Sequence, residues 1–570
     1  MGSWTMVIIL ISCIATLVAV AYVSYRLTRT TVSDRDGYFL AGRGLGAPFI
    51  AGSLLLTNLS AEQLIGLNGS AYGYNLSAMA WEVTAAIATI AMAFFFLPRY
   101  LKGGFTTLPE FLAQRYDEDA RRLSVILFLL GYGLVTIPSV LYSGSVAVLK
   151  ILNIPELLSL GYIASLWVTV IVIGLTGALY AILGGLRAVA VSDTFNGVGL
   201  LIVGVMVPFL GLKLLGQGDF GQGVSRLVQE HPEKLNAIGS AADPVPFGTL
   251  FTGMIFANLF YWCSNQYVIQ RTLAARSLAD GQKGVLLSGF FKVLVPFFMM
   301  IPGVIAYHLY GPGLSSIDLA YPQLVKDVFP MWLMGFFLAV LLGAVFSSFN
   351  SLINSAATLF TLDVIQPMRR RPLGDASLIR VAKWLSVLIA ITSVAVAPLL
   401  QFAPEGLWQI IRIFTGFYNI PMIVIVLVGM TTVRVPGVAV KTVIGFHVVT
   451  YGVFQFLLKD FIDIHFLHLY AILFVLEVGI MLTYGVLRPA APRRVLQQTV
   501  SIDMHPWRHG VACSVTLFSS VIALYVLFSP LGLVGGMGPI FWFVLSVLAL
   551  INAAVWYVSR CSQLRGGLGV

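Results

Sequence analysis

The sequence predicts an all-α polytopic membrane protein, and three observations support this prediction. Of its 570 residues, 58% are hydrophobic and only 10% are charged, with a mean hydropathy of +0.91, whereas a soluble domain carries about 25% charged residues. Apolar stretches of roughly 20 residues, the length that crosses a bilayer as a helix, recur along the chain. Basic residues gather in alternate loops, so the net charge of +10 reflects membrane orientation rather than nucleic-acid binding.

We expect about fifteen spans joined by short loops. The first span lacks the small-residue cleavage site of a signal peptide, so we expect it to be retained. Gly184-Gly185-Leu186 is typical of a tight turn between two spans, and Ser529-Pro530-Leu531-Gly532 could be a turn between the last two spans or a kink in one. The expected spans are 4–25, 48–73, 76–98, 121–148, 160–183, 188–213, 246–265, 283–310, 330–360, 377–400, 403–430, 437–458, 466–487, 508–529 and 538–558.

The basic residues indicate how the chain is oriented. Most of the 34 Lys and Arg residues lie in every second loop, among them Arg26, Arg29, Arg121, Arg122, Arg271, Arg276, Arg369, Arg370 and Arg371. The opposite loops carry only Lys150, Lys213, Arg226, Lys234, Lys326 and Lys459. Because cytoplasmic loops are enriched in Lys and Arg, we expect the N-terminus outside and the C-terminus in the cytoplasm.

The second expected span contains a polar break, Thr57-Asn58-Leu59-Ser60-Ala61-Glu62-Gln63, between apolar flanks. In hydrocarbon each backbone N–H and C=O needs a partner, so a polar or non-helical segment at mid-membrane is tolerated only where it lines a cavity. Broken helices of this kind bind ions and solutes in secondary transporters. The break therefore indicates a binding site.

Four ionisable residues lie in or near spans, where each costs roughly 2.5–3.5 kcal/mol on insertion scales and is a functional candidate by default. Glu82 and Lys292 have apolar neighbours on both sides, and they are either functional or a structural ion pair. Arg412 and Asp193 lie closer to expected span ends, where snorkelling or helix capping is an equal alternative.

A second polar segment, Asn258-Leu259-Phe260-Tyr261-Trp262-Cys263-Ser264-Asn265-Gln266, lies in the seventh span. It repeats the Asn-Leu pair and the later Gln of the first break. Five spans separate corresponding points, so the two helices would run in opposite directions, as in an inverted repeat. The aromatics either pack or stack on a sugar ring whose hydroxyls bond to the amides.

A third cluster, Ala344-Val345-Phe346-Ser347-Ser348, lies in the ninth span. Hydroxyls beside small residues favour close helix packing, although they also suit a cation that prefers hard oxygen ligands. The four cysteines have no metal-binding spacing, and no phosphate loop or nucleophile motif is present, so an ATP-driven pump or an enzyme has no support in the sequence.

Several separated motifs together resemble the solute:sodium symporter family, in particular its bacterial sodium/galactose and animal sodium/glucose members. The motifs are Tyr38-Phe39-Leu40-Ala41-Gly42-Arg43, Asn58-Leu59-Ser60-Ala61-Glu62-Gln63, Phe105-Thr106-Thr107-Leu108-Pro109-Glu110-Phe111, Gly184-Gly185-Leu186-Arg187-Ala188-Val189, Asn265-Gln266-Tyr267-Val268-Ile269-Gln270-Arg271-Thr272-Leu273-Ala274-Ala275 and Ser347-Ser348. The resemblance implies a LeuT-like core of two inverted five-helix repeats, at 45–215 and 245–430, with extra transmembrane helices at 1–30 and 435–560.

The resemblance also implies a function and its residues. The protein would be a sodium-coupled importer of a monosaccharide in the plasma membrane, the inner membrane of a bacterium, without enzymatic activity. Sodium would be bound by the backbone carbonyls of Leu56, Leu59 and Ala344 and the hydroxyls of Ser347 and Ser348, which reverses the preference for packing at the serine pair. The sugar would contact Gln63, Glu82, Asn258, Lys292, Tyr261 as inner gate, and Trp262. Asp193 would lie on the cytoplasmic exit route of sodium.

Two positions depart from the galactose pattern, which has serine in place of Ala85 and glutamine in place of Arg412. An arginine fork suits carboxylates, so one hypothesis is that Arg412 selects an acidic sugar. A proton symporter that uses Glu82 and Asp193, or a symporter of a non-sugar solute, remains an alternative, and the sequence leaves the oligomeric state open.

Overall fold

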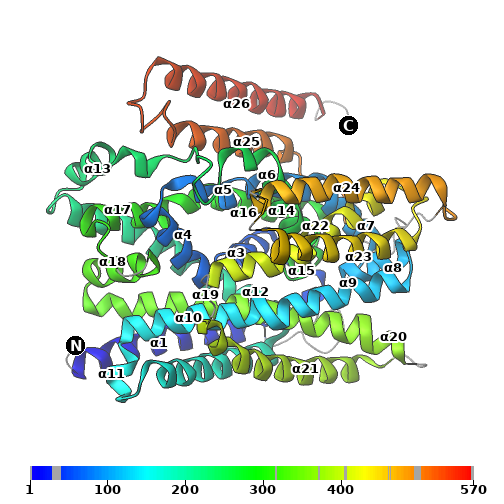
Figure 1. The fold of residues 1–570 in the computed structure, drawn as a ribbon, viewed down its shortest axis with the longest axis horizontal. Coiled ribbons are helices and arrows are strands. Elements are labelled where there is room, and N and C mark those ends of the chain that lie inside the picture. Colours follow the sequence, from blue (N-terminus) through cyan, green and yellow to red (C-terminus); the bar gives the residue numbers. More distant parts are fainter. Residues whose placement is uncertain are drawn as a thin grey trace.

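The computed structural model describes residues 3–28, 40–314, 317–369, 373–402, 407–459, 461–462, 464–492 and 502–566. Throughout these ranges the elements are helices, which run mostly along the longest axis of the molecule (Figure 1). Extended pairing in the described residues is limited to two isolated bridges, Leu45 with Ala275 and Ser277 with Asp503. The all-α prediction is therefore confirmed.

Twelve helices in the described ranges are long and apolar enough to cross a membrane. They are Val7–Ser24, Leu76–Gly103, Glu118–Leu149, Asp193–Leu215, Leu278–Tyr310, Met331–Met368, Asp375–Leu400, Phe414–Thr431, Gly437–Leu458, Phe466–Leu487, Gly510–Leu527 and Pro539–Cys561. The other three expected spans, 48–73, 160–183 and 246–265, correspond to shorter helical pieces. The prediction of a multi-pass membrane protein is confirmed with twelve candidate spans in the described residues, and the count of fifteen stays a prediction.

The expected span 48–73 is two helices, α3 (Ala47–Asn58) and α4 (Ala61–Gly73). Helical geometry stops at Leu59 (φ −80°, ψ 83°) and Ser60 (φ −94°, ψ 170°), where the Ser60 N–H donates to the Asn58 carbonyl at 3.0 Å. The polar break predicted here is thus a break in the helix itself.

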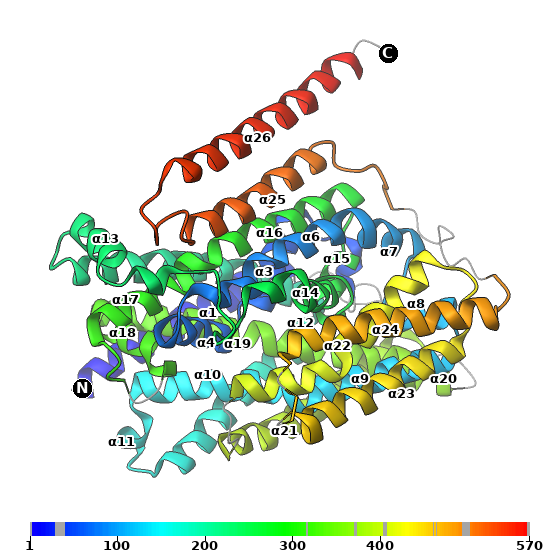
Figure 2. The same cartoon turned by 45° about the horizontal axis from the view of Figure 1, so that its top comes forward.

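The expected span 246–265 is interrupted in the same way, between α14 (Gly253–Cys263) and α15 (Gln266–Leu273). The N–H groups of Ser264 and Asn265 both donate to the Phe260 carbonyl at 2.9 Å, which ends the first helix. In both views α4 lies to the left of α3, whereas α15 lies to the right of α14 (Figures 1 and 2). The two broken helices therefore run in opposite directions, as an inverted repeat requires.

Helical backbone runs from Tyr162 to Leu215 (α12), 54 residues that would form a straight helix of about 80 Å. Both of its ends lie at the left of the molecule, beside α11 (Ile154–Leu158) and α13 (Phe220–Gln229) (Figures 1 and 2). The chain therefore reverses direction within α12. The side chains of the predicted turn, Gly184-Gly185-Leu186, lie outside the described residues.

The core is centred on α19 (Met331–Leu359), which packs against α12, α1 (Ser3–Thr28), α10 (Ile137–Leu152) and α3. In the most apolar stretch of the span that contains α19, 83% of the residues are buried, compared with 17% for the span in α1 and 6% for that in α26 (Pro539–Gly566). α26 accordingly lies apart from the bundle in Figure 2. α1 begins at the left and α26 ends at the right, so the two lie toward opposite ends of the long axis (Figure 1).

The remaining helices complete the bundle and its connections. They are α5 (Ala80–Val83), α6 (Ala85–Ala91), α7 (Leu97–Gly103), α8 (Leu108–Arg115), α9 (Glu118–Gly131), α16 (Leu278–Met299), α17 (Ile301–Tyr310), α18 (Ala320–Val328), α20 (Gln366–Met368), α21 (Asp375–Val396), α22 (Leu407–Thr431), α23 (Gly437–Val453), α24 (Phe466–Leu487) and α25 (Gly510–Leu527).

Candidate functional site

A cavity of about 180 Å³ lies where the two broken helices meet. Side chains from both breaks line it, together with side chains from α5, α6, α10, α19, α22 and α24. The polar members are Asn58, Ser60, Gln63, Glu82, Thr136, Asn258, Asn265, Ser348, Thr415 and Asn419, and the aromatic ones are Trp81, Phe260, Tyr261, Trp262, Tyr267, Tyr418, Phe466 and Tyr470. Both breaks predicted from the sequence therefore contribute to one site.

A buried charge pair forms one wall of the cavity. The Lys292 ammonium contacts the Glu82 carboxylate, and the Gln63 amide donates to Glu82 Oε1 at 3.1 Å. The side chains of Lys292 and Glu82 are only 1% and 3% exposed. Lys292 is not among the lining residues, so it lies behind Glu82 and neutralises its charge. The wall presented to a ligand is therefore polar without net charge.

Two amide oxygens at the first break have no partner in the described protein. Asn58 Oδ1 and Gln63 Oε1 are buried and belong to residues that line the cavity. A buried polar atom without a hydrogen bond costs about 1–3 kcal/mol, so such atoms are rare unless a ligand or water satisfies them. Both atoms are acceptors, which suits a ligand that carries hydroxyl or amine donors.

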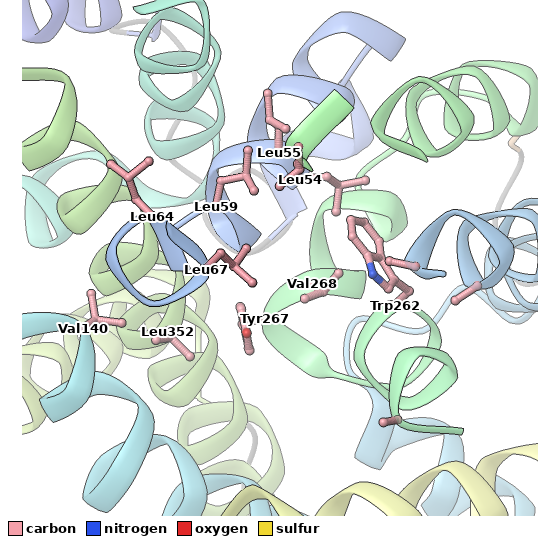
Figure 3. Close-up of a cluster of buried hydrophobic side chains, with 14 of the residues drawn as sticks. Leu54, Leu55, Leu59, Leu64, Leu67, Val140, Trp262, Tyr267, Val268 and Leu352 are labelled. Carbon is pink, nitrogen blue, oxygen red and sulfur yellow. The ribbon is translucent and has the colours of Figure 1, made fainter. Parts of the chain in front are cut away.

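The second break supplies amides and aromatic rings. The Asn258 amide donates to Thr84 Oγ1 at 2.9 Å, and the Tyr267 hydroxyl donates to the Tyr261 hydroxyl at 2.9 Å. The Tyr261 and Trp262 rings are 5.8 Å apart between centroids, and Lys292 Nζ lies 5.8 Å from the Trp262 ring. Apolar residues of both broken helices, among them Leu59 and Tyr267, belong to one buried cluster that encloses this region (Figure 3).

The residues predicted to bind sodium belong to α3 and α19, two helices that pack against each other. Leu56 and Leu59 are at the end of α3, and Ala344, Ser347 and Ser348 share one turn of α19. The Ser347 hydroxyl makes no hydrogen bond of ordinary geometry and lies near the Asp193 carboxylate, and Ser348 lines the cavity. In the described residues no cluster of three or more His, Cys, Asp or Glu side chains is placed to hold a metal ion.

Asp193 is 1% exposed within α12, so it is neither a helix cap nor a snorkelling side chain. Its Oδ2 accepts from the Ser53 hydroxyl at 2.9 Å, and that hydroxyl accepts from Arg271 Nε at 2.8 Å. The pattern of basic residues predicts that Arg271 lies in a cytoplasmic loop. That prediction is wrong, because Arg271 lies in α15 and is 0% exposed. The one sequence feature that could have indicated a buried position is that Arg271 belongs to the motif that begins at Asn265.

Sequence reasoning also missed the contribution of α24. Phe466 and Tyr470 line the cavity although they belong to a helix beyond the predicted ten-helix core. The hydrogen bond from the Asn258 amide to the Thr84 hydroxyl was also missed, because no pattern in the sequence sets Thr84 apart. Ala85 lines the cavity as expected. Arg412 falls in α22, but its side chain lies outside the described residues.

Comparisons with known proteins agree with this architecture. Residues 38–437 match the sodium:solute symporter family. The chain is 44% identical over 510 residues to an uncharacterised symporter of Escherichia coli (strain K12), YidK, covering 90% of this chain and 89% of that protein. It is 31% identical over 439 residues to a sodium/glucose cotransporter of Vibrio parahaemolyticus, covering 73% and 79%.

A solved structure shows the same fold. A Na+-coupled sialic acid symporter in a substrate-bound outward-open state aligns with a TM-score of 0.71 and 19% identity, covering 86% of this chain and 99% of that chain. The helices, the paired breaks and the sequence matches lead to one conclusion: the chain belongs to the sodium:solute symporter family.

Proposed function

We propose that the protein is a sodium-coupled importer of a neutral monosaccharide, which binds in the cavity between the two helix breaks. The carrying observation is the pair of unpartnered amide oxygens, Asn58 Oδ1 and Gln63 Oε1, beside a carboxylate whose charge Lys292 neutralises. A sugar supplies the hydroxyl donors that these acceptors lack, and its apolar faces suit aromatic rings such as Tyr261.

In this proposal the sugar contacts Gln63, Glu82, Asn258, Tyr261 and Trp262, and Lys292 acts by holding Glu82. Among the described side chains that line the cavity, Glu82 is the one Asp, Glu, Lys or Arg, and its carboxylate is paired with Lys292. This favours a neutral ligand over the acidic sugar that Arg412 suggested. A non-sugar polyol is the second candidate, since it would supply the same hydroxyls.

Sodium would bind the carbonyls of Leu56, Leu59 and Ala344 and the hydroxyls of Ser347 and Ser348. Gln63 lies only four residues beyond Leu59, so an ion that fixes the break also orients the amide for the sugar. By linkage the sugar then raises the affinity for sodium by the same factor. The membrane potential adds about 2.3 kcal/mol per charge per 100 mV, which allows sodium entry to concentrate a neutral solute.

The proposed orientation rests on the basic loops. The short helices α7, α8, α15 and α20, which adjoin the basic loops, lie at the right of the molecule in Figure 1, and α11 and α13 lie at the left. The right end would face the cytoplasm by the positive-inside rule. The N-terminus would then be outside and the C-terminus inside, in the inner membrane of a bacterium.

Uptake into proteoliposomes tests the function. With an inward sodium gradient at fixed pH, a panel of radiolabelled neutral sugars, one uronic acid and one polyol is compared with the same panel in choline. We expect sodium-dependent uptake of a neutral sugar and its loss in Gln63→Ala. Equal uptake in choline driven by a pH gradient would favour a proton symporter, and preference for the uronic acid that is lost in Arg412→Gln would favour an acidic sugar.

A further inference from the structure

A line of buried hydroxyls runs along α19 away from the predicted sodium ligands. Ser347, Ser351, Ser355 and Thr358 are three or four residues apart, which places them on one face of the helix. Each is 2% exposed or less. Because α19 runs toward α20 at the right of Figure 1, this line leads from the cavity toward the end of the molecule with the basic loops.

Two consecutive residues of α15 cover this line. Gln270 bonds to two of the hydroxyls: Ser355 Oγ donates to its Oε1 at 2.7 Å, and its Nε2 donates to Thr358 Oγ1 at 3.2 Å. Arg271 Nη2 donates to Ser351 Oγ, whose own hydroxyl donates to the Ser347 carbonyl at 2.6 Å. Three of the four hydroxyls along α19 that could solvate a cation, those of Ser351, Ser355 and Thr358, are therefore hydrogen-bonded to α15.

Arg271 also ties α15 to the other broken helix. Its Nε donates to Ser53 Oγ on α3 at 2.8 Å, and its Nη1 donates to the Tyr267 carbonyl. The Ser53 hydroxyl in turn donates to the Asp193 carboxylate. Every residue of α15 is buried. The halves of both broken helices on this side of the cavity are thus held together by one guanidinium, which also lies next to the hydroxyl line.

The positive charge of Arg271 adds electrostatic repulsion to these hydrogen bonds. A guanidinium stays protonated in proteins, and it stands beside the oxygens that a sodium ion would use. A second cation in the same line would meet direct repulsion in a buried region of low dielectric. Sodium could pass only after α15 has moved away from α19, which would leave Asp193 without its bridged cation and available to the ion.

We propose that Gln270 and Arg271 form the cytoplasmic seal of the sodium pathway, closing the hydroxyl line of α19 until α15 moves. This rests on the proposed sodium site at Ser347 and Ser348. The seal prevents sodium from crossing without solute. Weakening it therefore converts part of the coupled transport into a sodium leak.

The test measures sodium alone, because sodium is the ion whose leak the seal would prevent. Initial ²²Na⁺ uptake into proteoliposomes is recorded under an inward sodium gradient without any organic solute. We expect the rate to rise several-fold over wild type in Gln270→Ala, in Ser355→Ala and in Arg271→Lys, which keeps the charge but loses the three-way fork. Ser386→Ala is the matched control, since within the described residues that buried hydroxyl bonds to the Ala382 carbonyl of its own helix and to no residue of α15.

An unchanged leak in Gln270→Ala and Ser355→Ala, in protein that is monodisperse on size exclusion, overturns the seal. These two variants remove no charge, so the result stands even if Arg271→Lys fails to fold. The outcome is separable from the proposed function. If these variants raise the sodium leak but the protein imports no sugar, the proposed sugar substrate is rejected and the proposed seal is supported. If sodium–sugar symport is intact and the variants show no leak, only the seal is rejected.

Discussion

Removing Lys292 from behind Glu82 should destabilise the protein strongly, because the pair is almost wholly desolvated. In Lys292→Met the side chain of Glu82 stays only 3% exposed, and its carboxylate keeps the Gln63 amide, 3.1 Å from Oε1, as its one described partner. Removing one member of a buried ion pair costs about 3–5 kcal/mol. At 1.4 kcal/mol per factor of ten, the ratio of folded to unfolded protein would fall about 140- to 3,700-fold.

The double variant Glu82→Gln/Lys292→Met separates stability from function. It leaves no unpaired buried charge, and replacing a whole buried pair is often neutral for stability. We expect it to regain most of the lost stability while uptake stays abolished, because the wall of the cavity no longer carries the carboxylate. Stability is measured by denaturant unfolding in one detergent, and uptake in proteoliposomes under a sodium gradient.

Lys441→Met is the control for loss of a lysine from an ion pair. Lys441 contacts Asp119 at 2.5 Å, but both side chains are well exposed, so solvent replaces the lost partner. It should unfold close to the wild-type midpoint. The reasoning would be refuted if Lys292→Met were as stable as wild type, or if the double variant were as unstable as the single one.

Three further substitutions probe the remaining contacts. Ser348→Ala should raise the sodium concentration needed for half-maximal uptake with little change in expression; an unchanged sodium dependence removes it from the ion site. Thr84→Val takes away the acceptor of the Asn258 amide and should weaken sugar affinity, with a cost of about 1–3 kcal/mol for the unpaired group, measured as a rise in KM. Gly416→Ala should destabilise the protein by about 1–3 kcal/mol, because the added Cβ would lie 2.2 Å from the Tyr451 hydroxyl oxygen; a wild-type unfolding midpoint would contradict this packing.

Much of the cavity was predictable because its signals are local. The polar segment at Asn58–Gln63 and the later one at Asn258–Gln266 stand out against apolar flanks, and the bilayer permits such segments only around a cavity. Glu82 and Lys292 were recognisable for the same reason. Their pairing was one of two interpretations from the residues alone, and the structure brings them into contact.

Other features depend on contacts between distant segments. Arg271 resembles a cytoplasmic loop cation in sequence, but it is buried because α3 and α19 fold around α15 and supply its acceptors. Phe466 and Tyr470 line the cavity only because α24 packs against α14 and α22. Lys292 was predicted as a sugar ligand, and its position behind Glu82 became visible only when α16 was placed beside α5 and α6.

The sequence by itself determined the membrane class, the helical spans and the positions of the two breaks, because hydrophobicity and backbone hydrogen bonding in a bilayer are decided within single segments. Only the tertiary structure decided which charged groups form ion pairs and which buried polar atoms have no hydrogen-bond partner. Those properties depend on what lies opposite each side chain, and here the opposite group is often 100 or more residues away, as for Glu82 with Lys292 and Arg271 with Ser53.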